Sequence, residues 1–415
     1  MVSCSVDITP IWPTQLFGYA GRSCQFSQIA IRLEANILCF ISQGDVVSIV
    51  QLDTLFPSEI LKQEIQLRIT RPIRLVIVAS HTHFAPALDN EKPLLGKISE
   101  DYLTYVAEKI AGALNETLVD ERFAGNYIVS RARCDVACSR RKRTLKVGRR
   151  FPYIAIETAA LPNTDVSTPG NLVVIEIIDD LGRLQSVLWN WACHPVASPK
   201  KDEVSADYVG FVRDAIRQKC GQSIPVVFLP GFSGDLRPFI IDSHPSILNR
   251  LVYPLANCFF AANVTQEEFE RFSQAVAKCV CDCIGSQPTD GKLLSSVELC
   301  TSRIPLATLL NDNSDAQIPI ARLCVANDLQ LLFVGAEVSN GYDRIFKETF
   351  GAQAITIGYY ESVFGYLPLE SQVSEGGYEV TGFMRFFGVS GRFLRGFQGK
   401  FMDECEKRLQ DQMVL

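Results

Sequence analysis

The chain has 415 residues, of which 47% are hydrophobic and 21% charged, and its formal net charge is -6. This length fits one large domain or two ordinary ones, and the hydrophobic share is normal for a globular protein with a sizeable core. The negative balance argues against a nucleic-acid partner. The chain has no apolar run of about 18 residues, the length a spanning helix needs, so stable membrane insertion is not expected.

The N-terminal sequence, Met-Val-Ser-Cys-Ser-Val-Asp, has neither the basic nor the apolar region of a signal peptide. Without a secretion signal, the 14 cysteines are expected to be reduced thiols that pack as small hydrophobes. These features predict a cytoplasmic protein. The sequence leaves the oligomeric state open.

Strand-like and helix-like segments alternate along the whole chain. Several strand-like runs are rich in Val, Ile and Leu without alternating polar residues, which is typical of sheets covered on both faces. The helices have recognisable starts, such as the capping box that Thr265 opens. In chain order we expect strands at 29–41 and 46–52, a helix from Ser58 to about Ile69, a strand at 73–79, a helix from Ser99 to about Leu118, strands at 126–136, 172–178 and 184–191, a helix from Ser205 to Cys220, a strand at 226–229, a helix from Thr265 to about Ile284, and strands at 329–334 and 354–357.

No linker rich in Pro, Gly or Ser divides these elements. We therefore expect an α/β fold, built as a single large domain over residues 1–415 with mixed sheets covered by helices. The stretch 131–150 is basic and contains Arg140 and Arg141 at its centre, but it has no interleaved aromatic residues. For most of its charges a solvated loop is the better interpretation, and it is a poor nucleic-acid site.

Three of the four histidines lie in two short motifs, and each motif follows an expected strand. His81 and His83 come after the strand at 73–79, and His194 comes after the strand at 184–191. Strand ends are where active sites of α/β proteins form, and imidazoles brought together there are common ligands of zinc and other transition metals. A single histidine is more often structural, so it is the combination that predicts a metal site. One histidine of the first motif could bind metal while the other acts as acid or base.

Two further segments after strands could contribute to such a site. Glu337 follows an apolar strand and Gly335, so it could supply a carboxylate ligand; alternatively, it is a carboxylate near the start of a helix at 338–350. The segment 231–238 contains Asp235 and Arg237 and follows the strand at 226–229. It is either an ordinary turn or a substrate loop, and it lacks the Gly-X-Ser-X-Gly spacing of a serine nucleophile elbow.

Taken together, these motifs resemble the neutral (non-lysosomal) ceramidase family. Each motif alone is weak, but they occur in the family's order from residue 7 to residue 379. The residues that carry the resemblance are Asp7-Ile8-Thr9-Pro10 with Gly18-Tyr19-Ala20, Ser80-His81-Thr82-His83 with Pro86, His194-Pro195, Ser205-Ala206-Asp207 with Gly210, Gly234-Asp235 with Pro238, Gly335-Ala336-Glu337, and Gly365-Tyr366-Leu367-Pro368 with Gly376-Gly377-Tyr378-Glu379.

The resemblance implies a zinc-dependent hydrolase with an α/β catalytic domain. By position in the motifs, it implies that Zn2+ is held by His81, His194, Glu337 and Tyr366. Zinc is preferred for this donor set, although manganese or iron would also accept these ligands.

The same resemblance implies roles for the residues that meet the substrate. His83 would face the substrate, and Tyr378 would donate a hydrogen bond to its carbonyl oxygen. A substrate-binding arginine is expected at Arg140 or Arg141, although Ser139 stands where the family has asparagine. Asp235, in the loop after the strand at 226–229, is also expected to contact the substrate.

Two departures from the family pattern affect the expected substrate. Arg237 stands where ceramidases have a serine that is important for activity, and a guanidinium favours a polar or carboxylate-bearing substrate. The chain also ends about 37 residues after Tyr378, whereas the ceramide-cleaving members carry a C-terminal β domain and a secretion signal. We therefore expect no C-terminal β domain and a small substrate.

The sequence thus predicts a zinc-dependent hydrolase that cleaves an amide or ester bond of a small N-acyl or related substrate with a metal-activated water. His83 would protonate the leaving group. Two alternatives remain open: an enzyme that uses the same metal to form an amide or lactone, and a non-catalytic binding protein on a ceramidase-like scaffold.

Overall fold

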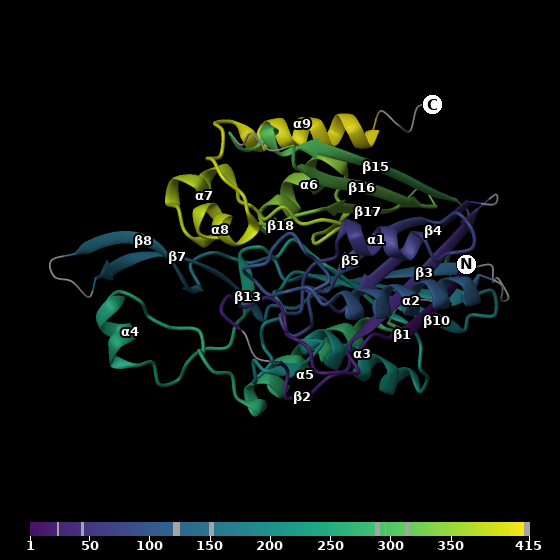
Figure 1. Ribbon diagram of the computed structural model, residues 1–415, viewed down its shortest axis with the longest axis horizontal. Helices are drawn as coiled ribbons and strands as arrows, with labels where there is room; N and C mark the ends of the chain where they lie inside the picture. Colours follow the sequence, from purple (N-terminus) through teal and green to yellow (C-terminus); the bar gives the residue numbers. More distant parts are fainter. Residues whose placement is uncertain are drawn as a thin grey trace.

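Three β-sheets of four or five strands form the body of the molecule, and helices cover the outer face of each (Figure 1). The structure is a computed structural model that describes residues 1–22, 25–42, 45–118, 125–148, 153–286, 291–294, 296–311, 315–326 and 328–410. Its mixed α/β architecture is the fold class that the alternating sequence pattern predicts.

The first sheet has the strand order β1-β3-β4-β5, in which only β4 and β5 run parallel. Its outer face packs against α1 and α2. Both helices begin where the sequence predicts, because Ser58 and Ser99 accept hydrogen bonds from the backbone N–H groups of the first turn. The elements are β1 (Val2–Asp7), β3 (Glu34–Ser42), β4 (Asp45–Leu52), α1 (Glu59–Gln66), β5 (Arg74–Ala79) and α2 (Glu100–Thr117).

The second sheet has the order β12-β10-β9-β6-β14, with β10 and β12 parallel. Helices α3 and α5 pack on its outer face. The capping box predicted at Thr265 opens α5, and Gly221 closes α3 with a φ of 65°. The elements are β6 (Gly125–Arg133), β9 (Asn171–Asp179), β10 (Leu184–Trp191), α3 (Asp207–Cys220), β12 (Val226–Pro230), α5 (Gln266–Cys283) and β14 (Lys292–Leu293).

The third sheet has the order β15-β16-β17-β19, and its last two strands are parallel. Helices α6 and α9 cover it, at the top of the view in Figure 1. The elements are β15 (Val297–Pro305), β16 (Gln317–Val325), β17 (Leu329–Val334), α6 (Tyr342–Phe350), β19 (Ile355–Ile357) and α9 (Phe397–Gln410).

The inner faces of the three sheets pack against one another in a central core. A fully buried aliphatic or aromatic side chain contributes about 1.5 to 3 kcal/mol, so this shared core holds the three sheets together. It includes Leu38 and Val76 from the first sheet, Ile175 and Leu229 from the second, and Leu323 and Phe333 from the third.

A smaller three-stranded sheet extends from β13 at the body, and its strands β7 and β8 project with one short helix at the left of Figure 1. The stretch 131–150, interpreted as a solvated loop, is here mostly strand: it includes the end of β6 and all of β7, so that interpretation is wrong for its described part. Arg149 and Arg150 lie outside the described residues. Consecutive charged residues on both faces hid the strand pattern; Arg141 is nevertheless buried, because it meets carboxylates there. The elements are β7 (Ala137–Val147), β8 (Ile154–Asn163), β13 (Leu236–Pro238) and α4 (Ile247–Val252).

Short elements complete the fold. The single strand expected at 29–41 is interrupted, because the backbone N–H groups of Ala30 and Ile31 donate to Val204 rather than to the first sheet. No described helix has the length and apolar character of a membrane span. The short elements are β2 (Gln28–Ile29), β11 (Glu203–Val204), η1 (Leu306–Thr308), β18 (Glu337–Val338), β20 (Tyr366–Leu367), α7 (Glu370–Glu375), the π-helical turn η2 (Tyr378–Gly382) and α8 (Met384–Phe387).

Candidate metal centre

The parallel strand pairs of all three sheets end at one place, and the candidate residues lie just beyond these ends. His81 follows β5, His194 follows β10, and Glu337 follows β17. The segments that leave the strands are joined by backbone hydrogen bonds, such as that from Ala79 N–H to the carbonyl of Tyr359. The central core therefore fixes groups that are far apart in sequence within one small volume.

The three imidazoles of His81, His83 and His194 face one another. One ring nitrogen from each lies within 4.8 Å of the others, a spacing that could hold a metal ion. His81 and His194 are buried, and His83 is half-buried. The three histidines of the two motifs are thus brought together.

Each imidazole is oriented by a backbone carbonyl. His81 Nδ1 lies 3.0 Å from the backbone oxygen of Leu55, and His83 Nδ1 lies 3.1 Å from that of Gly18. His194 Nδ1 lies 2.8 Å from the backbone oxygen of Ser233. A carbonyl oxygen only accepts, so each Nδ1 carries the proton and donates it. This leaves Nε2 as the inward-facing atom with a free lone pair, which is the arrangement of metal-binding histidines.

Glu337 supplies a buried carboxylate to the same point. Its Oε2 lies 3.1 Å from His194 Nε2 and 3.3 Å from His81 Nε2. Glu337 lies in β18, before α6 begins at Tyr342, so the alternative of a carboxylate at the start of a helix is wrong.

This donor set fits a divalent cation. Burial and the Arg140 charge lower the pKa of His194 to about 4, and burial lowers that of His83 well below 6.5, so both rings are neutral at pH 7. In His194 the unprotonated Nε2 then faces a carboxylate oxygen, and two lone pairs at 3.1 Å repel unless a cation lies between them. The Nε2 atoms of His81 and His83 are also buried without a hydrogen-bond partner among the described residues.

Tyr359 is a part of this site that sequence reasoning missed. Its ring stacks on His81 with 4.0 Å between centroids, and its hydroxyl lies 3.0 Å from the Ser233 hydroxyl. Both His81 and Tyr359 have positive φ angles, 69° and 56°, and such strain in non-glycine residues occurs mainly where the surroundings impose it. The only sequence signal was its place just after the strand expected at 354–357.

Tyr366 and Arg140 form the next contact around the centre. Tyr366 pairs with Glu337 in the short parallel ladder of β18 and β20. Arg140 Nη2 donates to the Tyr366 hydroxyl at 3.0 Å and to the Gly234 carbonyl at 2.8 Å, while its Nε donates to Glu379 at 2.7 Å. Burial, together with the Glu337 charge, raises the pKa of Tyr366 well above its usual value, so this phenol is neutral.

A cavity of about 580 Å³ opens onto the centre, between the body and the projecting arm. His83, His194 and Tyr366 line its inner end, together with Arg140. Tyr378 also lines it, and burial together with the Glu337 charge raises the pKa of this phenol to about 12, so it keeps its proton.

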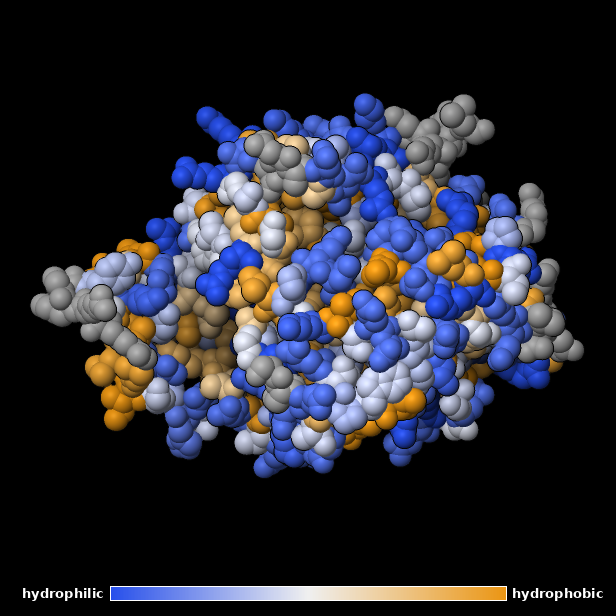
Figure 2. All heavy atoms as spheres, in the orientation of Figure 1, coloured by the Kyte–Doolittle hydropathy of each residue, from blue (hydrophilic) through white to orange (hydrophobic). Residues whose placement is uncertain are grey.

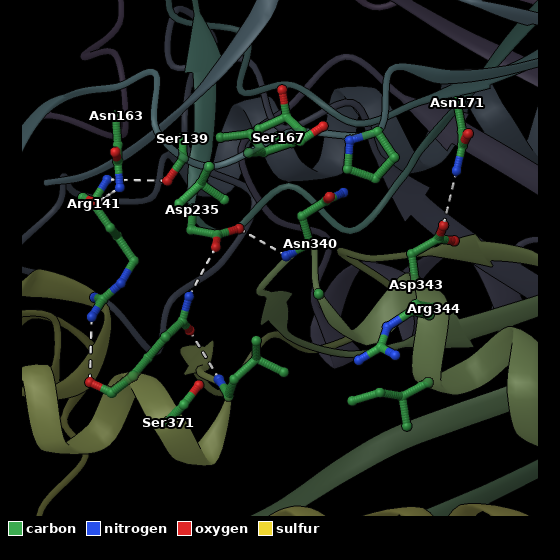
Figure 3. Close-up of a pocket in the computed structure, with 18 of the residues that line it drawn as sticks. Ser139, Arg141, Asn163, Ser167, Asn171, Asp235, Asn340, Asp343, Arg344 and Ser371 are labelled. Carbon is green, nitrogen blue, oxygen red and sulfur yellow. Dashed lines mark hydrogen bonds between the residues drawn. The ribbon is translucent and has the colours of Figure 1, made fainter.

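Arg237 lines the same cavity, but Asp235 does not. The Asp235 carboxylate faces a second cavity, where it accepts hydrogen bonds from Asn340 N–H at 2.7 Å and from Gln372 at 3.0 Å (Figure 3). The Asp235 side chain therefore does not face the histidines. Its hydrogen bonds instead connect α7 to the segment before α6.

Comparisons with known proteins agree with this architecture at the level of the fold. No protein-family model matches the chain, and no curated protein matches it. Among solved structures, neutral ceramidase from Pseudomonas aeruginosa is similar, with a TM-score of 0.70, 11% sequence identity and coverage of 91% of this chain and 70% of that chain. A ceramidase complexed with C2 has a TM-score of 0.65 and 12% identity, with coverage of 91% and 71%. The chain thus has a ceramidase-like fold.

Proposed function

We propose that this protein is a metal-dependent hydrolase that cleaves an amide bond of a small substrate. The observation that carries the proposal is the convergence of three unprotonated imidazole nitrogens and the Glu337 carboxylate at one buried point. The ceramidase-like fold supports the choice of an amide over other bonds.

His81, His194 and Glu337 would hold the ion, with Tyr366 as a further oxygen donor. Zinc is the proposed metal, since imidazole and carboxylate donors suit it. Such an ion, when bound, lowers the pKa of a water molecule and polarises a carbonyl group.

His83 is the proposed acid–base group. Its Nδ1–H is held by the Gly18 carbonyl, so Nε2 is the atom that faces the cavity. Because its pKa is low, this ring begins the reaction neutral; Nε2 accepts a proton from the attacking water and passes it to the leaving nitrogen.

Tyr378 is proposed to stabilise the substrate carbonyl oxygen. It keeps its proton at neutral pH and is 39% exposed at the cavity wall, so its hydroxyl can donate to a bound substrate. A donor of this kind contributes about 3 to 4 kcal/mol to transition-state binding. Arg140 fixes Tyr366, whose ring lies 5.5 Å from that of Tyr378.

The proposal is tested with purified protein loaded with one metal at a time and assayed against a panel of short N-acyl amines. We expect turnover with zinc that a chelator abolishes. His83→Ala should keep the ion but lose about 10²- to 10⁴-fold in kcat. Loss of the ion from His83→Ala would instead make His83 a third imidazole ligand, and metal-loaded protein that cleaves none of the panel would contradict the proposed activity.

A further inference from the structure

The cavity beside the metal centre is lined by positive charge in a protein of net negative charge. Arg140, Lys201 and Arg237 line it, and none of its described lining residues is an aspartate or glutamate. The chain as a whole carries a formal charge of -6, so this local excess is a specific feature of the cavity. A concave site lined by one sign of charge raises the local concentration of ligands of the opposite sign.

The charge of Arg140 is compensated within the protein, because Glu379 binds it at 2.7 Å. Other buried arginines are compensated in the same way. Arg141 shares Glu379 at 2.6 Å and also meets Glu375 at 3.2 Å, and Arg213 pairs with Asp53 at 2.5 Å. Buried charge in this protein is therefore met by a carboxylate as a rule, as the cost of desolvation requires.

Arg237 departs from that rule. Its guanidinium makes no hydrogen bond or ion pair within the described part of the chain. Arg141 and Arg213 also have an Nε without a hydrogen bond, but an Nη atom of each binds a carboxylate. The guanidinium instead lies 4.4 Å from the centre of the Phe260 ring. Burial and the neighbouring Arg140 charge lower the pKa of Arg237, and both effects disfavour a charged group without a counter-ion.

Part of the cavity wall is apolar, and it includes Phe260 beside Arg237. Leu161, Phe259, Phe260 and Val264 belong to this part of the wall. On the outside of the projecting arm, Ile154 and Ile156 of β8 and Leu251 of α4 are exposed, at the apolar left end of the molecule in Figure 2. The cavity thus offers one unpaired cation beside a surface suited to an alkyl or acyl arm.

We propose that Arg237, with Lys201 at the rim, binds a carboxylate group of the substrate while the wall formed by Leu161, Phe259, Phe260 and Val264 holds an apolar arm. A guanidinium presents paired N–H donors that match the two oxygens of a carboxylate. The substrate class is then an amide that carries both a free carboxylate and a short acyl or alkyl chain. This inference rests on the proposed amide hydrolysis and specifies its substrate.

The test compares two acids with their uncharged carboxamide counterparts. N-hexanoylglycine has its carboxylate on the amine side of the scissile bond, and N-hexylsuccinamic acid has it on the acyl side. We expect zinc-loaded protein to prefer at least one acid over its carboxamide by about 10-fold or more in kcat/KM. A preference for either acid supports the proposal, and the preferred acid shows on which side of the scissile bond Arg237 lies. Equal rates for the acids and their carboxamides would overturn it.

Arg237→Met removes the charge and keeps most of the volume. We expect it to lose the preference for the acid, with a fall of about 10- to 100-fold for the acid and little change for the carboxamide. Arg237→Lys should recover part of the preference. Arg143→Met, at an exposed position of β7 outside the cavity, is the matched control and should behave as wild type. Metal content and thermal unfolding establish that each variant is folded and loaded.

Calorimetric binding of the two acids separates this inference from the proposed hydrolysis. If the protein cleaves neither acid but binds one of them more tightly than its carboxamide, and Arg237→Met abolishes the difference, the carboxylate site stands and the hydrolase proposal fails. If Arg237→Met retains the preference for the acid, the assignment to Arg237 is overturned whatever the activity.

Discussion

The two cavities on either side of the β13-β7-β8 sheet differ in whether their cationic side chains meet a carboxylate. Adjacent residues of a strand point to opposite faces, so Arg140 faces the metal-centre cavity and Arg141 the second cavity. The second cavity is larger, about 1080 Å³ against about 580 Å³. Its cationic side chains are paired with carboxylates, however, among them Arg141 with Glu379, and Lys347 with Asp343 at 2.7 Å.

The smaller cavity, in contrast, contains polar atoms that the protein leaves without partners. Among the described residues these are His83 Nε2 and the Arg237 guanidinium, and His81 Nε2 lies just behind the wall. In the second cavity Arg141 Nε also lacks a hydrogen bond, but the Nη atoms of the same guanidinium bind carboxylates. Buried polar groups are normally satisfied, so groups left unsatisfied indicate a missing ligand better than volume does. The comparison therefore assigns chemistry to the smaller cavity and a structural role to the polar groups of the larger one.

The largest expected effect comes from exchanging one buried carboxylate in each region. Glu337→Gln keeps the shape of the side chain but removes the charge that faces His81 and His194. Loss of a residue that only contacts a metal ligand lowers metal affinity by about 10- to 100-fold, so we expect loss of this direct ligand to lower it by at least about 100-fold. Asp235→Asn is the control; it weakens two hydrogen bonds at the second cavity and should keep its ion. Metal titration by calorimetry measures both. Equal losses in the two variants would erase the distinction between the regions.

A smaller effect is expected at Gly18, which supports His83. Its φ is 108°, and a Cβ there would lie 2.9 Å from His83 Nδ1. Gly18→Ala should displace the imidazole and lower kcat by about 10- to 100-fold with the fold intact. Gly21→Ala is a matched control, because Gly21 also has a positive φ, 83°, but nothing lies within 4 Å of its Cβ position. Similar kcat values for the two variants would show that His83 need not be held in place.

The smallest effect is expected from removing single hydroxyl groups. Tyr359→Phe loses the contact with Ser233 but keeps the ring stacked on His81, so we expect about 1 kcal/mol less stability in urea and a change in metal affinity of a few-fold. Tyr342 lies in α6, and Tyr342→Phe loses the hydrogen bond from its hydroxyl to the Pro368 carbonyl. This variant should lose similar stability and keep its metal affinity unchanged. If metal affinity changed in Tyr342→Phe but not in Tyr359→Phe, the contact between Tyr359 and the metal centre would be without effect, contrary to this prediction.

The sequence predicts the framework of the centre because the strands that carry it are unusually apolar. The runs before His81, His194 and Glu337 have few polar interruptions, so the positions of these residues at strand ends could be inferred without a structure. Strands with many polar or charged residues, such as β7 and β15, did not produce that signal.

The cavities and side chains that the predicted residues meet could not be predicted from the sequence, because they depend on tertiary contacts. Arg140 and Arg141 read as one basic patch, but the pleat of β7 sends them into different cavities. Asp235 is adjacent to the loop that orients His194, yet its side chain points to the opposite side. Tyr359 stacks on a histidine that is 278 positions away only because two sheets end at the same place.

Metal stoichiometry tests the central claim most directly. The wild-type protein, stripped with chelator and dialysed against zinc, should retain about one ion per chain by elemental analysis. The double variant His81→Gln, His194→Gln, shown by circular dichroism to be folded, should retain none. A folded double variant that still holds one equivalent would contradict the account, because the ion would then be bound elsewhere in the molecule.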